Sequence, residues 1–437
     1  MSQHIGGGKL FSLGLQHVLA MYAGAILVPL LVGRALNLTP TQLSYLVAID
    51  LLTCGVATII QAWKTKYLGI GLPVMLGSSF VAVTPMIGIG SQYGIQAIYG
   101  AIISAGVFII VFATAFGKIV KLFPPVVTGT VVAIIGLSLI PTGVTNMAGG
   151  SGSSNFGSME NLLLSFGVLF LILLLNRFFR GFTRALSVLI GIIGGTAAAF
   201  VMGRVDLSEA GEASWILTPQ IFYFGVPTFE LAPIITMIIV GMVIVVESTG
   251  VFFALGKVCN QKIHEKDLSR GYRAEGLAIL LGGFFNAFPY NTFAQNVGLV
   301  ELSGVKTRNV IITAGGILIF LGFIPKIAAL ATAIPTPVLG GATVVMFDMV
   351  VASGIRMLGA VDLNNHYNLL TVACSISLSV GATFVPELFS SLPEGIRIIV
   401  SDGVITGSLA AISLNLFFTF RSRQPAFSIQ QSKAKEA

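Results

Sequence analysis

Side chains that could bind a ligand interrupt one of the apolar stretches of this sequence. Residues 288–298 read FPYNTFAQNVG and place a proline, a glycine and the amides of Asn291, Gln295 and Asn296 within apolar sequence. A backbone that leaves its helix at membrane depth is tolerated only where it is packed in protein or lines a cavity. The Gln295 amide offers both an acceptor and a donor, which suits a planar ligand whose rim alternates N–H and C=O groups.

A second stretch shows the same pattern. Residues 71–85 read GLPVMLGSSFVAVTP, again a proline, a short β-prone run and small polar residues. Two such interruptions in corresponding halves indicate a substrate site at a repeat interface. The alternative is helix packing through small and amide residues, which does not explain the paired proline breaks.

The backbone of the later stretch could also face a ligand. Residues 290–295 alternate as in a short strand, and Asn296 could start the following helix. A strand that feeds a helix N-terminus presents backbone N–H groups and a positive dipole end. Phe80 and Phe293 could supply aromatic faces for stacking.

Glu247 is the strongest of five acidic candidates within apolar runs, which are Asp50, Glu247, Glu275, Glu301 and Asp348. Ionisable residues inside a membrane are costly and by default functional. Glu247 lies near the middle of its run, and its alternative role is a buried carboxyl satisfied by a neighbouring helix. Glu301 is expected to form an interfacial ion pair, and Asp50 and Asp348 to hydrogen-bond between helices.

Glu275 and His17 each leave two roles open. Glu275 could be a proton site, or an interfacial cap and partner of Arg273. His17 follows Gln16 early in the first apolar run, so these side chains either support the site or tie helices together.

The composition identifies the class of protein. The chain has 437 residues, 55% hydrophobic and 9% charged, with a mean hydropathy of +0.94, whereas soluble proteins carry about 25% charged residues. Apolar runs of about 20 residues, enough to cross a bilayer, recur along the chain. The net charge of +7 lies in short loops as a topology signal, so we expect a polytopic membrane protein in the lipid bilayer, with no nucleic-acid partner.

The apolar runs predict fourteen membrane segments. They lie near residues 12–32, 43–62, 68–88, 94–116, 123–142, 160–176, 185–203, 231–256, 274–288, 290–303, 309–330, 335–354, 368–386 and 396–420.

The charges support this number of segments. If the N-terminus is cytoplasmic, all but four of the 24 Lys and Arg residues fall in loops predicted inside. The four exceptions are Arg34, Arg204, Lys326 and Arg397. Such a bias is the positive-inside rule, and one missed segment would invert every later loop. Both termini are therefore predicted to be cytoplasmic. The first apolar run is expected to remain as a membrane span, because no signal-peptide cleavage pattern follows it.

Fourteen segments divide into two inverted repeats of seven. Residues 1–203 form the first repeat and 231–420 the second, joined by an external linker at 204–230 and followed by a disordered cytoplasmic tail at 421–437. An odd number of segments per half forces opposite orientations. The third segments, 68–88 and 290–303, are then the two interrupted stretches.

At these residues the chain resembles the nucleobase–ascorbate, or nucleobase–cation symport-2, transporter family. The family signature is Gln, Glu or Pro, then Asn, any residue, Gly, four residues, Thr and often Gly. Residues 295–304, QNVGLVELSG, meet it with serine in place of the threonine. The resemblance covers essentially the whole chain, and its further motifs are Gln16-His17, Ser78-Ser79-Phe80, Glu247-Ser248-Thr249-Gly250, Ala274-Glu275-Gly276 and Phe288-Pro289.

The resemblance implies an all-α fold of fourteen segments with core and gate domains, short strands in segments three and ten, and usually a homodimer. It implies proton-coupled nucleobase uptake across the bacterial cytoplasmic membrane, with protons as the coupling ion and no other cofactor. Carried over by position, the site would use Glu247, Gln295, Phe80, Phe293, Ala294 and Asn296, with His17 in the surrounding network and Glu275 at a position where aspartate is common.

Glutamine at the first signature position resembles the purine branch of the family. Xanthine is therefore the first expectation for the substrate, urate a close second and uracil a distant third. Anion exchangers share the seven-plus-seven architecture, but their sites favour basic residues near the broken segments. A channel would need a continuous polar stripe, and a membrane enzyme would need a metal or nucleophile cluster, for which the sequence shows no ligand spacing.

Overall fold

The computed structural model describes residues 6–119 and 124–422. Lys121 and most of the predicted tail, from residue 423 onward, lie outside these ranges. The first half of the chain forms α1 (Gly7–Ala35), α2 (Pro40–Ala62), β1 (Leu76–Ser78), a 3-10 turn (Phe80–Ala82), α3 (Val83–Tyr93), α4 (Ile95–Ile119), α5 (Pro125–Met147), α6 (Met159–Phe178), α7 (Phe182–Ala185) and α8 (Ser187–Val201).

The second half follows the short helix α9 (Ser208–Glu212). It forms α10 (Leu231–Val258), α11 (Glu265–Phe284), β2 (Tyr290–Thr292), α12 (Gln295–Ser303), α13 (Arg308–Gly322), α14 (Pro325–Thr332), α15 (Thr336–Leu358), α16 (His366–Phe384), a 3-10 turn (Pro386–Phe389), α17 (Glu394–Ser401) and α18 (Gly403–Ser422).

Each predicted segment corresponds to a helix or a broken helix. Within the described residues, eight helices are long and apolar enough to cross a membrane, or nine when α13 and α14, bent by 79°, count as one span. Of the other segments, α3 and α12 follow a strand, α8 is shorter, and α17 and α18 divide the last segment. The helix α11 is long enough, with 20 residues, but its first half carries charged side chains. The prediction of an all-α polytopic fold with short strands in segments three and ten is confirmed.

The packing of the helices repeats between the two halves. α2 packs on α13 as its counterpart α11 packs on α4, and α1 packs on α13 as α10 packs on α4. Likewise α6 packs on α8 as α16 packs on α18. Exchanging the halves therefore returns the same set of contacts, which is the property of an inverted repeat.

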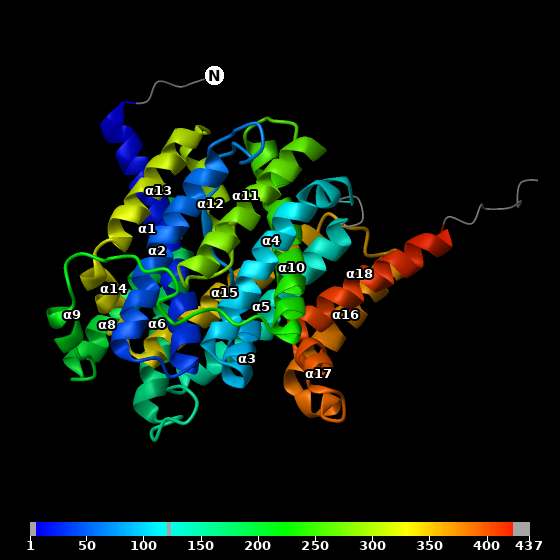
Figure 1. Ribbon diagram of the computed structural model, residues 1–437. Coiled ribbons are helices and arrows are strands. Elements are labelled where there is room, and N and C mark those ends of the chain that lie inside the picture. The colour runs from blue at the N-terminus through cyan, green and yellow to red at the C-terminus, as the bar shows by residue number, and fades with distance from the viewer. Residues whose placement is uncertain (1–5, 120–123, 423–437) are drawn as a thin grey trace, which may run out of the picture.

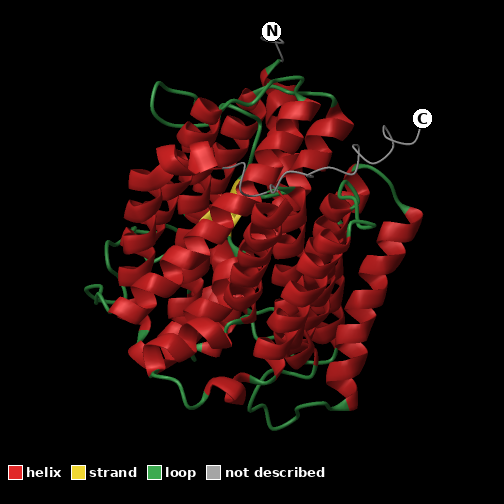
Figure 2. Ribbon diagram, turned by 90° about the vertical axis from the view of Figure 1, so that its right-hand side faces the viewer, coloured by secondary structure: helices red, strands yellow, loops and turns green. Residues whose placement is uncertain are grey.

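These contacts divide the molecule into two groups of helices. The core domain consists of α1–α4 and α10–α14 with both strands, and the gate domain consists of α5–α8 and α15–α18. Figure 2 shows the strands enclosed among the helices. In Figure 1 the loop after α2 and the turn between α10 and α11 lie at the same end as the start of α1, as the charge pattern predicts.

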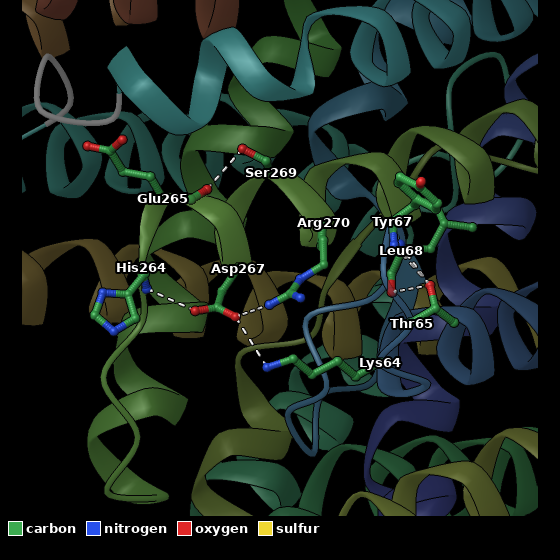
Figure 3. Close-up of polar contacts among 9 residues, drawn as sticks. All are labelled: Lys64, Thr65, Tyr67, Leu68, His264, Glu265, Asp267, Ser269 and Arg270. Carbon is green, nitrogen blue, oxygen red and sulfur yellow. Dashed lines mark hydrogen bonds and ion pairs between the residues drawn. The ribbon is translucent and has the colours of Figure 1, made fainter.

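Polar contacts at that end fasten the loop before β1. Asp267, in the first turn of α11, accepts hydrogen bonds from Arg270 and from the His264 backbone N–H, and pairs with Lys64 Nζ at 3.2 Å (Figure 3). The backbone N–H of Gly69 also donates to the Arg270 carbonyl at 3.1 Å. The loop that leads to β1 is thus bonded to α11, the helix that precedes β2.

Glycines let the core helices cross closely. A Cβ on Gly315 of α13 would lie 2.8 Å from the Gly55 carbonyl oxygen and 2.7 Å from Ile59 Cγ1 on α2. Small residues at such crossings allow backbone approach in membranes. The α2–α13 contact therefore depends on the absence of a side chain.

We expect Gly315→Ala to lower the free energy of unfolding by about 1–3 kcal/mol, the usual cost of overpacking. The neighbouring Gly316 is exposed and has open space around it, so Gly316→Ala is the matched control and should be close to neutral. Thermal unfolding of both purified variants in detergent measures the difference. Equal melting temperatures would contradict the close crossing.

Candidate functional site

The two interrupted segments meet as an antiparallel pair of strands. Leu76 pairs with Thr292, Gly77 with Asn291 and Ser78 with Tyr290. The pairing continues past the strand ends, where the Phe293 N–H donates to the Met75 carbonyl at 2.9 Å and the Ser79 N–H donates to the Pro289 carbonyl at 2.8 Å. The backbone groups that the helix breaks expose are thereby satisfied within protein.

A buried carboxylate holds the strands in place. Asp50 of α2, fully buried, accepts hydrogen bonds from the hydroxyls of Ser78 on β1 and Tyr290 on β2, the latter at 2.9 Å. The Tyr290 hydroxyl also contacts that of Thr53. Asp50 was expected to hydrogen-bond between helices, and instead it joins α2 to both strands. The sequence reasoning missed Tyr290 and Thr53, and the spacing of Asp50 and Thr53 on one face of α2 was the available signal.

Glu247 lies on α10 beside the second strand. Its Oε2 accepts a hydrogen bond from Asn291 Nδ2 at 2.6 Å. The next residue, Ser248, accepts from the Thr292 hydroxyl at 3.1 Å. A hydrogen bond to a carboxylate, such as the bond from Asn291 to Glu247, is among the stronger ones in proteins. Together with the Ser248 contact it fixes α10 against β2, with the Glu247 side chain at the strand edge.

Glu275 is deeper in the core domain than an interfacial residue would be. Glu275 is fully buried, and neither of its carboxyl oxygens forms a well-aligned hydrogen bond within the described residues. The side chains of Ser248 and Glu247 lie close to it. Arg273, the alternative partner weighed from the sequence, donates instead to Thr114 Oγ1 at 2.6 Å. An isolated carboxylate is expensive to bury, so this position suits a group that holds a proton.

His17 and Asn296 tie two helices together. Asn296 Nδ2 lies 3.0 Å from His17 Nδ1 and donates to the His17 carbonyl at 3.1 Å. Because the Asn296 amide nitrogen can only donate, Nδ1 accepts and the ring proton sits on Nε2. The contact fixes α12 against α1, and neither residue lines the cavity described next.

A cavity of about 620 Å³ lies between the core and gate domains. The core domain contributes Ala20, Ala23, Gly24, Phe80, Val81, Glu247, residues 291–295, Gly298, Leu299 and Leu302. The gate domain contributes Val132, Ile135, Asn176, Ser187, Val188 and residues of α15 from Met346 to Arg356, and the connection between α6 and α8 adds Arg180, Gly181, Arg184 and Ala185.

Five of the residues predicted for the site share this cavity: Phe80, Glu247, Phe293, Ala294 and Gln295. Gln295 is half-buried, and within the described residues no hydrogen bond occupies its amide. Phe80 packs edge-on against Phe347 of the gate domain, with ring centroids 5.6 Å apart. The amide of Gln295 and the ring of Phe80 thus line one cavity together with Glu247.

Phe293 has a different environment from Phe80. A Cβ on Gly77 would lie 2.5 Å from its ring, and one on Gly24 would lie 2.6 Å from it. The ring therefore fills a slot between α1 and β1 that two glycines leave open. This position suits a support for the strand pair, and Phe293 and Ala294 also line the cavity.

Comparison with known proteins identifies the family. A family model described as "Permease family" matches residues 8–388. The chain belongs to this family, the nucleobase–ascorbate transporters. It is a multi-pass membrane protein, and the relatives that it matches are permeases.

Individual relatives cover nearly the whole chain. The uric acid permease PucJ of Bacillus subtilis is 68% identical over 95% of this chain and 94% of its own length. The xanthine permease of the same organism is 54% identical over 96% of this chain and 95% of its own length. The uric acid transporter UacT of Escherichia coli is 43% identical over 94% of this chain and 86% of its own length.

Solved structures show the same fold at low identity. The transmembrane domain of the cyanobacterial bicarbonate transporter BicA matches with a TM-score of 0.58 at 15% identity, covering 95% of this chain and 98% of its own. SLC26A9 matches with a TM-score of 0.61 at 12% identity, and the match covers 95% of this chain and 67% of the SLC26A9 chain. Within the described residues no group of His, Cys, Asp and Glu is arranged to hold a metal ion.

We expect Tyr290→Phe to lower the free energy of unfolding by about 1–3 kcal/mol, because Asp50 would lose one of its two hydroxyl donors while staying buried. Tyr99→Phe is the control, since Tyr99 is equally buried and its hydroxyl has no hydrogen bond within the described residues. Melting temperatures of the two purified variants give the comparison. A Tyr290 variant as stable as the Tyr99 variant would contradict the role of the Asp50 contacts.

Proposed function

We propose that this permease takes up an oxidised purine base, urate or xanthine, together with protons across a bacterial cytoplasmic membrane. The observation that carries the proposal is the shared cavity of Glu247, Gln295 and Phe80 between the core and gate domains. A carboxylate accepts N–H groups, a primary amide pairs with a neighbouring donor and acceptor, and an aromatic ring stacks on a planar face. Together these groups complement a flat heterocycle with alternating N–H and C=O groups.

The relatives give urate the same weight as xanthine. Two uric acid permeases of Bacillus subtilis, PucJ and PucK, are 68% and 59% identical to this chain, and a xanthine permease is 54% identical. Urate and xanthine share the ring edge that Gln295 and Glu247 would bind. The likeness to bicarbonate and anion transporters is one of fold alone, and the amide of Gln295 and the ring of Phe80 match a planar heterocycle, whereas an inorganic anion has no ring to stack.

Two carboxyl groups would couple the base to protons. Glu247 would bind the base directly, and Glu275, close to it through Ser248, would hold a proton in the buried core. His17 and Asn296 would keep α12 in position. The core domain would then move against the gate domain and expose the cavity to each side in turn.

The surroundings of the transporter are also part of the proposal. Both termini would be cytoplasmic, following the loop charges. Apolar side chains are exposed on helices of the gate domain, among them Phe166, Phe170 and Phe417. Contact with lipid and with a second copy of the chain in a homodimer would cover them.

We expect Gln295→Ala to lower uptake of both bases at least about tenfold, because a site built to hydrogen-bond its ligand loses a donor and an acceptor together. Gln92→Ala, an exposed residue on α3, is the matched control and should transport normally. Initial uptake of radiolabelled urate and xanthine by cells, corrected for protein in the membrane, is the measurement. Unchanged uptake by the Gln295 variant would show that Gln295 does not bind the base.

Glu247→Gln should abolish proton-driven accumulation while part of the binding of the base is kept, because the amide can still accept one N–H but cannot carry a proton. Accumulation by proteoliposomes under an imposed pH gradient and equilibrium binding in detergent separate the two effects. Unchanged accumulation would show that the coupling lies elsewhere.

A further inference from the structure

The cavity has a second polar region at the end away from the strands. Arg180, Arg184 and Arg356 line it there, and we refer to these three residues as the arginine mouth. Arg180 and Arg184 lie in the connection from α6 to α8, and Arg356 lies in the last turn of α15. All three side chains are exposed, at the end of the gate domain that the charge pattern assigns to the cytoplasm.

The arginine mouth shows no ion pair in the part of the chain that the structure describes. Within that part Glu247, at the other end, is the one acidic residue in the cavity lining. The positive-inside rule explains basic residues in cytoplasmic loops, but it does not require that their side chains line a cavity. Arg177, in the same stretch of chain and also exposed, is not part of the lining.

Arg184 is held in position by its neighbours. Its Nε donates to Asn176 Oδ1 at 3.3 Å, and the Asn176 amide donates to Ser187 Oγ and to the Ile172 carbonyl, both at 2.9 Å. One edge of the guanidinium is thus occupied. The terminal N–H groups have no hydrogen bond within the described residues and remain available at the mouth.

The opposite wall of the cavity is apolar and open. It consists of Gly298, Leu299 and Leu302 on α12, and a side chain on Gly298 would meet nothing within 4 Å. A guanidinium carries a permanent positive charge and attracts planar, delocalised anions. A passage with guanidinium groups on one side and apolar surface on the other therefore suits a flat, negatively charged ring.

We propose that the arginine mouth is a second binding site, for the anionic form of the purine base on its way between Gln295 and the cytoplasm. The inference rests on the proposed function and adds a basis for choosing among its substrates. Urate loses a proton more readily than xanthine and is an anion at neutral pH, so the mouth favours urate.

The test compares two triple variants at Arg180, Arg184 and Arg356 with a single control variant at Arg177. With glutamine at all three positions, the ratio of urate to xanthine uptake should fall about eightfold, since each exposed charge contributes about a factor of two. Lysine at all three positions keeps the charge and should retain most of the ratio. Arg177→Gln, the matched control in the last turn of α6, should leave the ratio unchanged. Raising the ionic strength inside proteoliposomes should lower urate transport by the wild type and not by the glutamine variant.

The results separate this inference from the proposed function. An unchanged ratio in the glutamine variant, or an equal loss of both bases, overturns the arginine mouth and leaves purine transport standing. A ratio in the lysine variant as low as in the glutamine variant also overturns it, because charge would then not be what the mouth provides. A wild-type protein that transports neither base overturns both.

Discussion

The fold depends on one constraint, which is that backbone broken inside a membrane must find its hydrogen bonds in protein. Two strands of three residues each, β1 and β2, meet it by pairing with one another. A two-stranded ribbon is marginal by itself, so the surrounding helices must hold it. Asp50 does so from α2 through Ser78 and Tyr290, and Ser248 does so from α10 through Thr292.

The pairing gives the cavity its composition. Both strands end where a short helix begins, so the residues after each strand, Phe80 on one side and Gln295 on the other, reach the same space. The inverted repeat makes this possible, because the third segment of each half enters from the opposite side of the membrane. The gate domain completes the cavity, and a movement of one domain against the other would leave the strand pair intact.

Much of this architecture could be predicted from local sequence. Hydropathy and loop charges gave fourteen segments, and the proline breaks indicated the two strands. The partner of a buried group could not be predicted, because it comes from a distant part of the chain. Tyr290 bonds to Asp50, which lies 240 positions away. Glu275 is buried near Ser248 while Arg273 binds Thr114, and Phe293 fills a gap whose glycines lie far from it in the chain.

The central claim is that the paired breaks build a site for a purine and not for an inorganic anion. Competition against uptake of radiolabelled urate by the wild-type protein tests it most directly. Unlabelled urate and xanthine should inhibit at similar low concentrations and uracil weakly, while bicarbonate and sulfate should have no effect in a large excess. Inhibition by bicarbonate or sulfate comparable to that by xanthine, or the absence of inhibition by xanthine, would contradict the account.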